Sequence, residues 1–209
     1  SDFDGTISKV DFFNHVIDNL LTKDDLKPWK DHEAGKITHI EGLSGIFSKI
    51  KMPVPEFHKF ILTLPIEEQF VETVNYCRSK EIPIYVISAG CDYYINILFK
   101  HLGVDDYITL YTNKGFYSET TGLTMKSLPE DHPYYSYNLG VDKQAAVKDI
   151  SQKYDYSIFA GDGRPDIKAA GLTTLTFARG ALKELCLQKG IPTQPFEHYG
   201  NILELLKNV

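Results

Sequence analysis

A chain of 209 residues is long enough for one full-sized domain, or for a core domain that carries a smaller insertion. Hydrophobic residues make up 43% and charged residues 24%, which excludes a disordered or low-complexity protein. The net charge of −6 and the lack of a basic stretch interleaved with aromatic residues exclude a nucleic-acid-binding surface.

The cysteines indicate a reducing compartment. Cys77, Cys91 and Cys186 lack both the CxxC spacing of a zinc site and the density of a disulfide framework. No apolar run approaches the length of about 18 residues that crosses a membrane, and no signal-peptide pattern is present. We therefore expect a cytoplasmic protein without a membrane partner. Nothing in the sequence indicates an oligomeric state.

The chain opens with "SDFDGT", in which two aspartates stand one residue apart. Taken alone, such a pair fits a charged, disordered terminus as well as a functional site. In an extended segment Asp2 and Asp4 would share one face, with Phe3 on the other, because alternate side chains of a strand point the same way. A central strand normally carries several apolar residues before such a pair, so we expect further residues upstream of Ser1.

Residues 10–80 have helical patterns and no strand pattern. "VDFFNHVIDNLL" and "FVETVNYC" repeat apolar residues at helical spacing. "THIEGLSGIFSKI" begins with a capping box formed by Thr38 and Glu41. We expect this block to be a helical cap inserted into a core made of residues 1–9 and 81–209.

Three short apolar runs predict buried strands: "IPIYVIS" at 82–88, "YSIFAG" at 156–161 and "TLTFA" at 174–178. Helical patterns follow the first two and stop at Gly103 and Gly171. This alternation predicts an α/β fold with a Rossmann-like parallel sheet, in which ligands bind where the strands end.

Residues 107–140 interrupt this alternation. The segment "YITLYTNKGFYSETTGLTMK" has β-prone runs around Gly and Ser, and the Pro- and Tyr-rich "LPEDHPYYSYN" follows it. We expect a small β-hairpin and a loop, inserted within the core.

Polar residues follow the predicted strands at the edge where a ligand should bind. "SAG" follows the first strand, "GDGRPD" follows the second, and one lysine begins the helix "DKQAAVKDI". With the opening aspartates they supply carboxylates, a hydroxyl, backbone donors and an ammonium, as phosphoryl transfer requires. The residues are Asp2, Asp4, Ser88, Ala89, Gly90, Lys143, Asp162 and Asp166.

Some of these residues have an alternative structural explanation. Taken singly, Asp162 and Asp166 could cap a helix. Lys143 could be a solvated helix residue, with Lys148 as a rival on the same helix. Their occurrence together favours the functional interpretation.

Four motifs in order, "DFDGT", "VISAG", Lys143 and "GDGRPD", resemble those of the haloacid dehalogenase (HAD) superfamily, in its phosphoserine-phosphatase-like branch. One such motif would be weak evidence, but four spread over nearly the whole chain are strong evidence. The resemblance implies a Rossmann-like core with an inserted cap. It also implies a Mg²⁺-dependent phosphomonoesterase that hydrolyses a small phosphorylated metabolite through an aspartyl-phosphate.

The resemblance further implies roles for the acidic residues. Asp2 would attack phosphorus, and Asp4 would protonate the leaving group and then activate water. The Asp2 carboxylate, the Asp4 carbonyl and Asp162 would bind Mg²⁺, since hard oxygen ligands suit this ion. Asp166 would lie outside these ligands and orient Lys143 or a water.

The phosphate would be bound by the two remaining motifs. Ser88 and the backbone N–H groups of Ala89 and Gly90 would bind phosphoryl oxygens, and Lys143 would offset their charge. The three cysteines and the histidines would take no part.

Two departures from phosphoserine phosphatases concern the substrate. Pro165 stands where their last motif has Asn, and no arginine lies between residues 10 and 77 to bind a substrate carboxylate. Phosphoserine hydrolysis is therefore one alternative. Phosphoryl transfer to a second substrate and a non-catalytic binding domain are two others.

Overall fold

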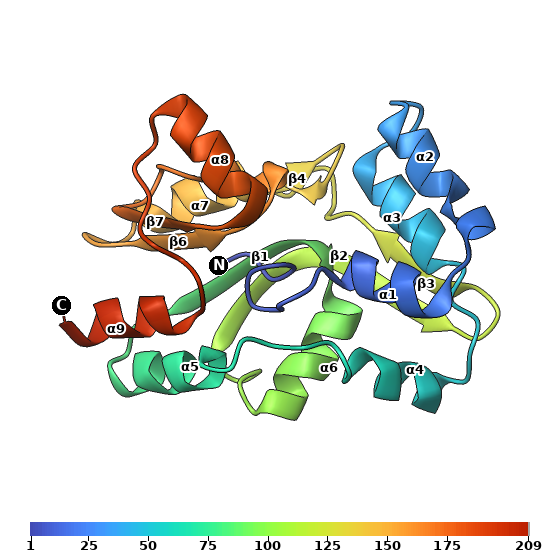
Figure 1. Cartoon of the computed structure of the whole chain (residues 1–209), viewed down its shortest axis with the longest axis horizontal. Coiled ribbons are helices and arrows are strands. Elements are labelled where there is room, and N and C mark those ends of the chain that lie inside the picture. Colours follow the sequence, from blue (N-terminus) through green and yellow to red (C-terminus); the bar gives the residue numbers. More distant parts are fainter. Residues whose placement is uncertain (209) are drawn as a thin grey trace.

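The core contains two parallel pairs of strands, seen in a computed structural model that describes residues 1–208 (Figure 1). β1 (Ile84–Cys91) pairs with β2 (Ile108–Ser118), and β6 (Ile158–Gly161) pairs with β7 (Leu175–Ala178). Each strand falls on a predicted apolar or β-prone run. The parallel pairing confirms the Rossmann-like α/β core.

The first residues of the chain join the two pairs. The Ser1 amine donates to the Tyr85 carbonyl at 2.8 Å, and the Ile87 N–H donates to the Ser1 carbonyl at 2.9 Å. On the other side, the Asp2 N–H donates to the Ala160 carbonyl at 2.9 Å. The opening segment is therefore extended backbone between β1 and β6, and it delivers Asp2 to the middle of the sheet.

An apolar cavity of about 490 Å³ borders Ser1. Its wall includes Ile84 of β1 and Ile158 of β6, together with Val147 and Ile202 from two helices. None of the motif aspartates lines it, so it is separate from the predicted site. The expected residues upstream of Ser1 stay a prediction.

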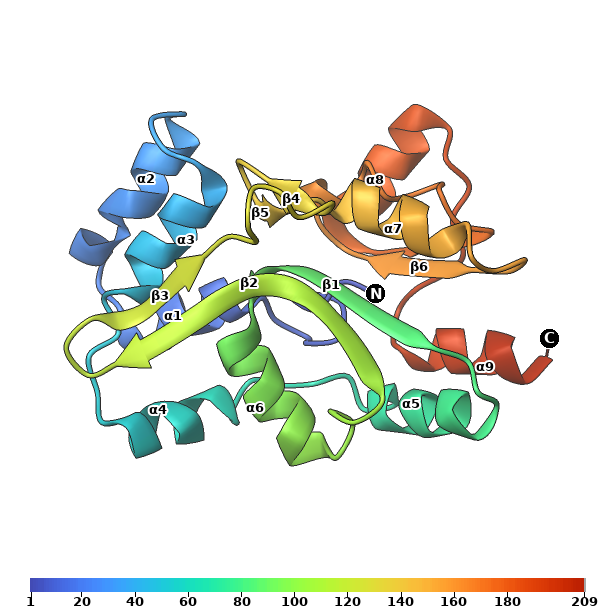
Figure 2. The ribbon, with the colours of Figure 1, turned by 180° about the vertical axis from the view of Figure 1, so that it is seen from behind.

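Helices cover both faces of the sheet. In Figures 1 and 2, α5 (Phe70–Ser79), α6 (Asp92–Leu102) and α9 (Gly200–Asn208) lie on one side, and α7 (Lys143–Ser151) and α8 (Gly180–Lys189) lie on the other. α6 ends at the predicted Gly103, whose φ of 67° is the left-handed conformation that glycine adopts readily. No helix within residues 1–208 combines the length and apolar character needed to cross a membrane.

The segment predicted to be helical before β1 forms a series of short helices: α1 (Phe12–Leu20), a 3₁₀ helix at Lys23–Leu26, α2 (Lys27–Glu33), α3 (His39–Phe47) and α4 (Val54–Ile61). The predicted capping box begins α3, where the Thr38 hydroxyl accepts from the Glu41 N–H. α5 packs against α9, so the helices of this segment do not all lie in one group.

The predicted hairpin is present. The second half of β2 pairs with β3 (Gly122–Lys126) in antiparallel register, and β3 packs against α3. The Met125 N–H donates to the Ser44 hydroxyl at 2.9 Å across this contact. The following loop contains a short ribbon of β4 (Tyr135–Ser136) and β5 (Gly140–Val141).

The helix predicted after β6 is wrong in type. Residues 164–171 form a 3₁₀ turn, Arg164–Asp166, followed by further turns, in place of an α-helix that ends at Gly171. The Asp166 carboxylate folds back to accept from the Asp162 and Gly163 N–H groups. This local pairing satisfies the backbone without a full helical ladder.

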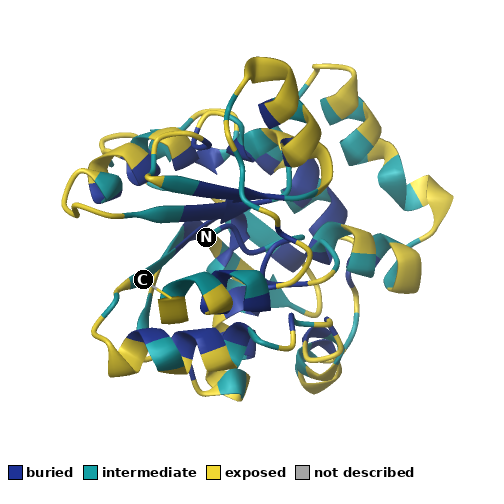
Figure 3. Cartoon of the chain, turned by 60° about the vertical axis from the view of Figure 1, so that its left-hand side comes forward, coloured by how far each residue is buried: buried dark blue, intermediate teal, exposed yellow. Residues whose placement is uncertain are grey.

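One hydrophobic cluster connects the early helices with the sheet. Phe12 of α1 packs edge-on against Phe47 of α3, at 5.4 Å between ring centroids, and stacks on Tyr94 of α6 at 4.0 Å. The buried residues in Figure 3 gather along the sheet and the inner helix faces. The position of α1 is therefore fixed by packing against both neighbours.

Candidate active site

Asp2 is followed by a tight loop that turns back on the sheet. The N–H groups of Thr6, Ile7 and Ser8 all donate to the Phe3 carbonyl, at 3.2, 2.8 and 3.0 Å. Gly5 has a φ of 70°, and a Cβ there would lie 2.2 Å from an Asp162 carboxylate oxygen. Glycine is therefore required for the turn and for the close approach of Asp162.

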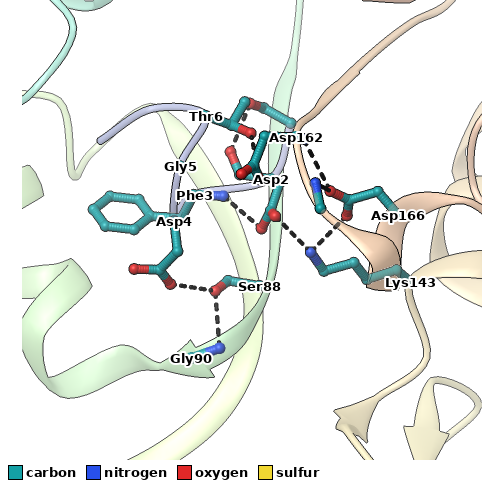
Figure 4. A network of polar contacts seen from close by, with 12 residues as sticks. Asp2, Phe3, Asp4, Gly5, Thr6, Ser88, Gly90, Lys143, Asp162 and Asp166 are labelled. Atoms are coloured by element: carbon teal, nitrogen blue, oxygen red, sulfur yellow. Dashed lines mark hydrogen bonds and ion pairs between the residues drawn. The ribbon is translucent and has the colours of Figure 1, made fainter. Parts of the chain in front are cut away.

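Lys143 lies at the centre of the site (Figure 4). Its Nζ is 2.7 Å from Asp2 Oδ2 and 2.7 Å from Asp166 Oδ1. All three side chains are buried, and Asp166 is completely so. The ion pairs join three segments that are far apart in the sequence, since α7 supplies Lys143 and the loop after β6 supplies Asp166.

The carboxylates of Asp2, Asp162 and Asp166 face one another. Each has an oxygen within 4.8 Å of an oxygen of the other two. Asp166 already uses both of its oxygens, one for Lys143 and the other for the N–H groups of Asp162 and Gly163, at 3.1 and 3.0 Å. Asp2 and Asp162 are thus better placed than Asp166 to bind a cation directly.

One ammonium group faces three carboxylates in this cluster. Burial raises the pKa of Asp2 well above its ordinary value; Asp166 raises it further, and Lys143 opposes both. Burial and Asp166 also raise the pKa of Asp162 to about 6. Burial would lower the pKa of Lys143, but Asp166 and Asp2 outweigh this effect and raise it.

The donor set fits a hard divalent cation. The cluster is rich in carboxylate oxygens and has an excess of negative charge, which a cation such as Mg²⁺ would neutralise. No sulfur or imidazole ligand belongs to it. The geometry therefore suits the ion that the motifs predict.

Asp4 points to the other side of the loop and makes several hydrogen bonds. Its Oδ1 accepts from the Phe12 N–H at 3.0 Å, and its Oδ2 accepts from the Tyr94 hydroxyl at 2.6 Å and the Ser88 hydroxyl at 3.3 Å. Burial raises the pKa of Asp4, and the hydrogen bonds from Tyr94 and Phe12 oppose this rise. A buried carboxyl with a raised pKa can hold a proton, as an acid requires.

The "SAG" residues lie at the end of β1, where its pairing with β2 becomes irregular. The Gly90 N–H donates to the Ser88 hydroxyl at 2.9 Å. The Ala89 carbonyl accepts from the Asn113 amide at 2.8 Å, and the Gly90 carbonyl accepts from the Thr112 hydroxyl at 2.9 Å. These side chains hold the end of β1 beside Asp4.

All the predicted site residues thus meet at one edge of the sheet, and two further side chains that contact them were not predicted. Tyr94 contacts Asp4, as described above. Arg179 donates to the Gly5 and Thr6 carbonyls, at 2.8 and 3.1 Å, and to Glu67 at 2.7 Å. Arg179 therefore ties the loop after Asp2 to the end of β7. No spacing in the sequence indicates either contact.

Comparison with known proteins was made by sequence and by structure. No protein-family model matches the chain. A curated relative from Lysinibacillus sphaericus is 25% identical over 213 residues, covering 100% of this chain and 92% of its own. Another from Bacillus cereus is 27% identical over 210 residues, covering 100% and 94%. Both are named 2-hydroxy-3-keto-5-methylthiopentenyl-1-phosphate phosphatase.

Solved structures share the fold. A phosphoserine phosphatase with an analogue of the phospho-aspartyl intermediate matches with a TM-score of 0.59 at 21% identity, covering 88% of each chain. A HAD family hydrolase from Salmonella enterica serovar Typhi matches with a TM-score of 0.69 at 16% identity, covering 97% of this chain and 68% of its own. The predicted fold and the resemblance to HAD phosphatases are confirmed.

Arg179→Met should destabilise the protein, because it leaves the buried Glu67 carboxylate without its cation. Breaking a buried ion pair costs about 3 kcal/mol, which corresponds to a fall of roughly 6–12 °C in melting temperature for a chain of this size. Differential scanning calorimetry measures the change. Arg78→Met is the matched control, since Arg78 pairs with Asp106 at the surface and its loss should cost under about 1 kcal/mol. Equal shifts for the two variants would contradict the assignment.

Mg²⁺ should raise the melting temperature, because it neutralises excess carboxylate charge in the folded state only. Saturation at about 100 times the dissociation constant adds about 2.7 kcal/mol, or roughly 5–10 °C. Asp162→Asn should lose most of this shift, and Asp105→Asn, at an exposed position, should keep it. An unchanged shift in Asp162→Asn would rule out this cluster as the binding site.

Proposed function

We propose, from this full-length resemblance to phosphatases of the HAD superfamily, that the protein is a Mg²⁺-dependent phosphomonoesterase acting on a small phosphorylated metabolite. The observation that carries the proposal is the buried contact between Asp2 and Lys143, at 2.7 Å, beside the carboxylates of Asp162 and Asp166. A carboxylate nucleophile held by an ammonium group at the end of a parallel sheet suits the attack on an anionic phosphate.

Hydrolysis proceeds in two displacements on phosphorus. First, an Asp2 carboxylate oxygen attacks phosphorus, the bond to the leaving oxygen breaks, and Asp4 gives its proton to that oxygen. Then Asp4 takes a proton from water, the water oxygen attacks phosphorus, and Asp2 is released with inorganic phosphate. Lys143 holds Asp2 in place and offsets the charge of the transferring group.

Mg²⁺ is the cofactor in this proposal. Asp2, Asp162 and the Asp4 carbonyl would hold it, and Asp166 would act indirectly through its bonds to Lys143 and the backbone of the loop. When bound, the ion reduces the repulsion between a carboxylate nucleophile and an anionic substrate.

Ser88, Ala89 and Gly90 are the proposed phosphate-binding residues. The Ser88 hydroxyl and the Gly90 N–H bond to each other and lie beside Asp4. Exchange of this local bond for bonds to phosphoryl oxygens would keep both donors satisfied. The phosphate would then lie between the end of β1 and Asp2.

The substrate is proposed to be covered by the helices of residues 10–80, as a cap on a core of 1–9 and 81–209, with 107–140 as a further insertion. An aromatic cluster in this cap supports a weakly charged substrate. Trp29 packs with Phe13 at 4.4 Å and edge-on with His39 at 5.6 Å. Burial, with smaller effects from His32 and Lys143, lowers the pKa of His39 to about 4, so its ring is neutral at physiological pH.

The relatives' name gives a candidate for the chemistry of the substrate. It describes a phosphate ester with a methylthio-bearing chain. Such an uncharged tail is compatible with the aromatic cluster and with a cap that has no arginine. A cytoplasmic location is proposed with it, supported by three cysteines that are buried free thiols.

Asp2→Asn should abolish turnover, because the amide removes the nucleophile while nearly preserving the side-chain shape. Steady-state phosphatase assays should show a loss of about 10⁴-fold or more. Asp24→Asn, at an exposed position in the 3₁₀ helix before α2, should retain parental activity. Activity of Asp2→Asn within about tenfold of the parent, a barrier change of only ~1.4 kcal/mol, would exclude the aspartyl-phosphate.

Phosphoserine should be hydrolysed at least about tenfold less efficiently than the phosphate named for the relatives, because the cap offers no guanidinium for its carboxylate. The measurement is kcat/KM for these two compounds, with sugar and pyridoxal phosphates in the same panel. A preference for phosphoserine of about tenfold or more would overturn this expectation. Products formed with added alcohols would reveal phosphoryl transfer, and no hydrolysis of any compound would favour a binding domain.

A further inference from the structure

Tyr94 reaches from α6 to the predicted acid and base. Its hydroxyl donates to Asp4 Oδ2 at 2.6 Å, a shorter bond than the two others that Asp4 makes. The side chain is 1% exposed. Within residues 1–208 the hydroxyl has no other hydrogen-bond partner. A buried polar group with a single partner is committed to that partner.

Aromatic packing fixes the direction of this hydroxyl. The Tyr94 ring stacks on Phe12 with centroids 4.0 Å apart and planes 13° apart, and it meets Phe3 edge-on at 5.9 Å. Both neighbours are completely buried. The ring is therefore held from two sides, so the hydroxyl cannot leave Asp4 without disturbing the core.

Gly90 leaves the space that the hydroxyl needs. A Cβ at this position would lie 1.8 Å from the Tyr94 hydroxyl oxygen and 2.9 Å from Asp4 Oδ2. The glycine of "SAG" therefore does more than expose a backbone donor. It allows Tyr94 and Asp4 to meet beside the end of β1.

The other contacts of Asp4 are less permanent in the proposed reaction. The Ser88 hydroxyl lies 3.3 Å from Oδ2 and would turn to the phosphate when substrate binds. The Phe12 N–H binds the opposite oxygen, Oδ1, and belongs to the first helix of the proposed cap. Tyr94 is the partner of Oδ2 that comes from the core and has no duty toward the phosphate.

We propose that Tyr94 is a positioning residue that holds the Asp4 carboxyl in the orientation needed for proton transfer to the leaving oxygen. This inference rests on the proposed role of Asp4. A general acid works only within hydrogen-bond distance of the atom it protonates, and small misplacements lower the rate strongly. A hydroxyl on a locked ring restricts the rotation of the Asp4 side chain.

Tyr94→Phe tests this role, because it removes the hydroxyl and keeps the ring packing. The matched control is Tyr93→Phe, since the neighbouring Tyr93 hydroxyl bonds to His58 at 2.9 Å, away from Asp4. Both variants are compared with the parent on glycerol phosphate and on p-nitrophenyl phosphate. The alkoxide leaving group needs a proton and the nitrophenolate does not, and kcat/KM reports the step in which this group departs.

Tyr94→Phe should lower kcat/KM by about 10- to 100-fold for glycerol phosphate and by less than about threefold for p-nitrophenyl phosphate. Tyr93→Phe should change neither value by more than about threefold. A purely structural role would lower both substrates equally, and an equal loss, no loss or a gain in Tyr94→Phe would overturn the proposal.

A crystal structure of Tyr94→Phe supplies a readout that does not depend on activity. The Asp4 carboxyl should leave the position that it has in the parent, whereas an unmoved carboxyl would overturn the proposal. If the parent and Tyr93→Phe hydrolyse neither substrate, the proposed function fails, and the position of Asp4 in this structure still decides the role of Tyr94.

Discussion

The contact of Lys143 with Asp2 and Asp166 is the interaction on which the site depends. A buried ammonium group is costly without carboxylate partners, and buried carboxylates are equally costly without a cation. Each group therefore makes the burial of the others tolerable, and the ion pairs connect the opening segment, α7 and the loop after β6. Because Asp162 adds a third carboxylate, the balance remains negative, and a divalent cation would stabilise this arrangement further.

Two constraints keep the loop after Asp2 in the shape that this contact needs. Gly5 adopts a left-handed φ, and it allows Asp162 to approach more closely than any side chain would permit. Arg179 binds carbonyl groups of the same loop and neutralises Glu67, whose other carboxylate oxygen accepts from the Tyr199 N–H at 3.3 Å. The loop is thus also fixed by Arg179 and Glu67, which take no part in the proposed chemistry.

The short motifs could be predicted from the sequence because their residue types and spacing are local. The strands around "VISAG" and "GDG" and the helix that begins at Lys143 follow from the same local patterns. The helix expected at 164–171 was wrong because the Asp166 side chain competes for backbone N–H groups, which apolar spacing does not reveal. The contacts of Tyr94 and Arg179 could not be predicted, since their partners lie about 90 and 170 residues away and meet them only through the sheet topology.

The two opening aspartates, one residue apart, are held by different parts of the molecule. Asp2 is bound by Lys143 and by the adjacent Phe3 N–H, both belonging to the sheet and its crossover helix. Asp4 is bound by the Phe12 N–H of α1 and by Tyr94 of α6, so its position depends on how the first cap helix packs on the core. A movement of α1 would therefore displace the acid and base while leaving the nucleophile in place. In such a site, binding under the cap and proton transfer to the leaving group are coupled through the stacked rings of Phe12 and Tyr94.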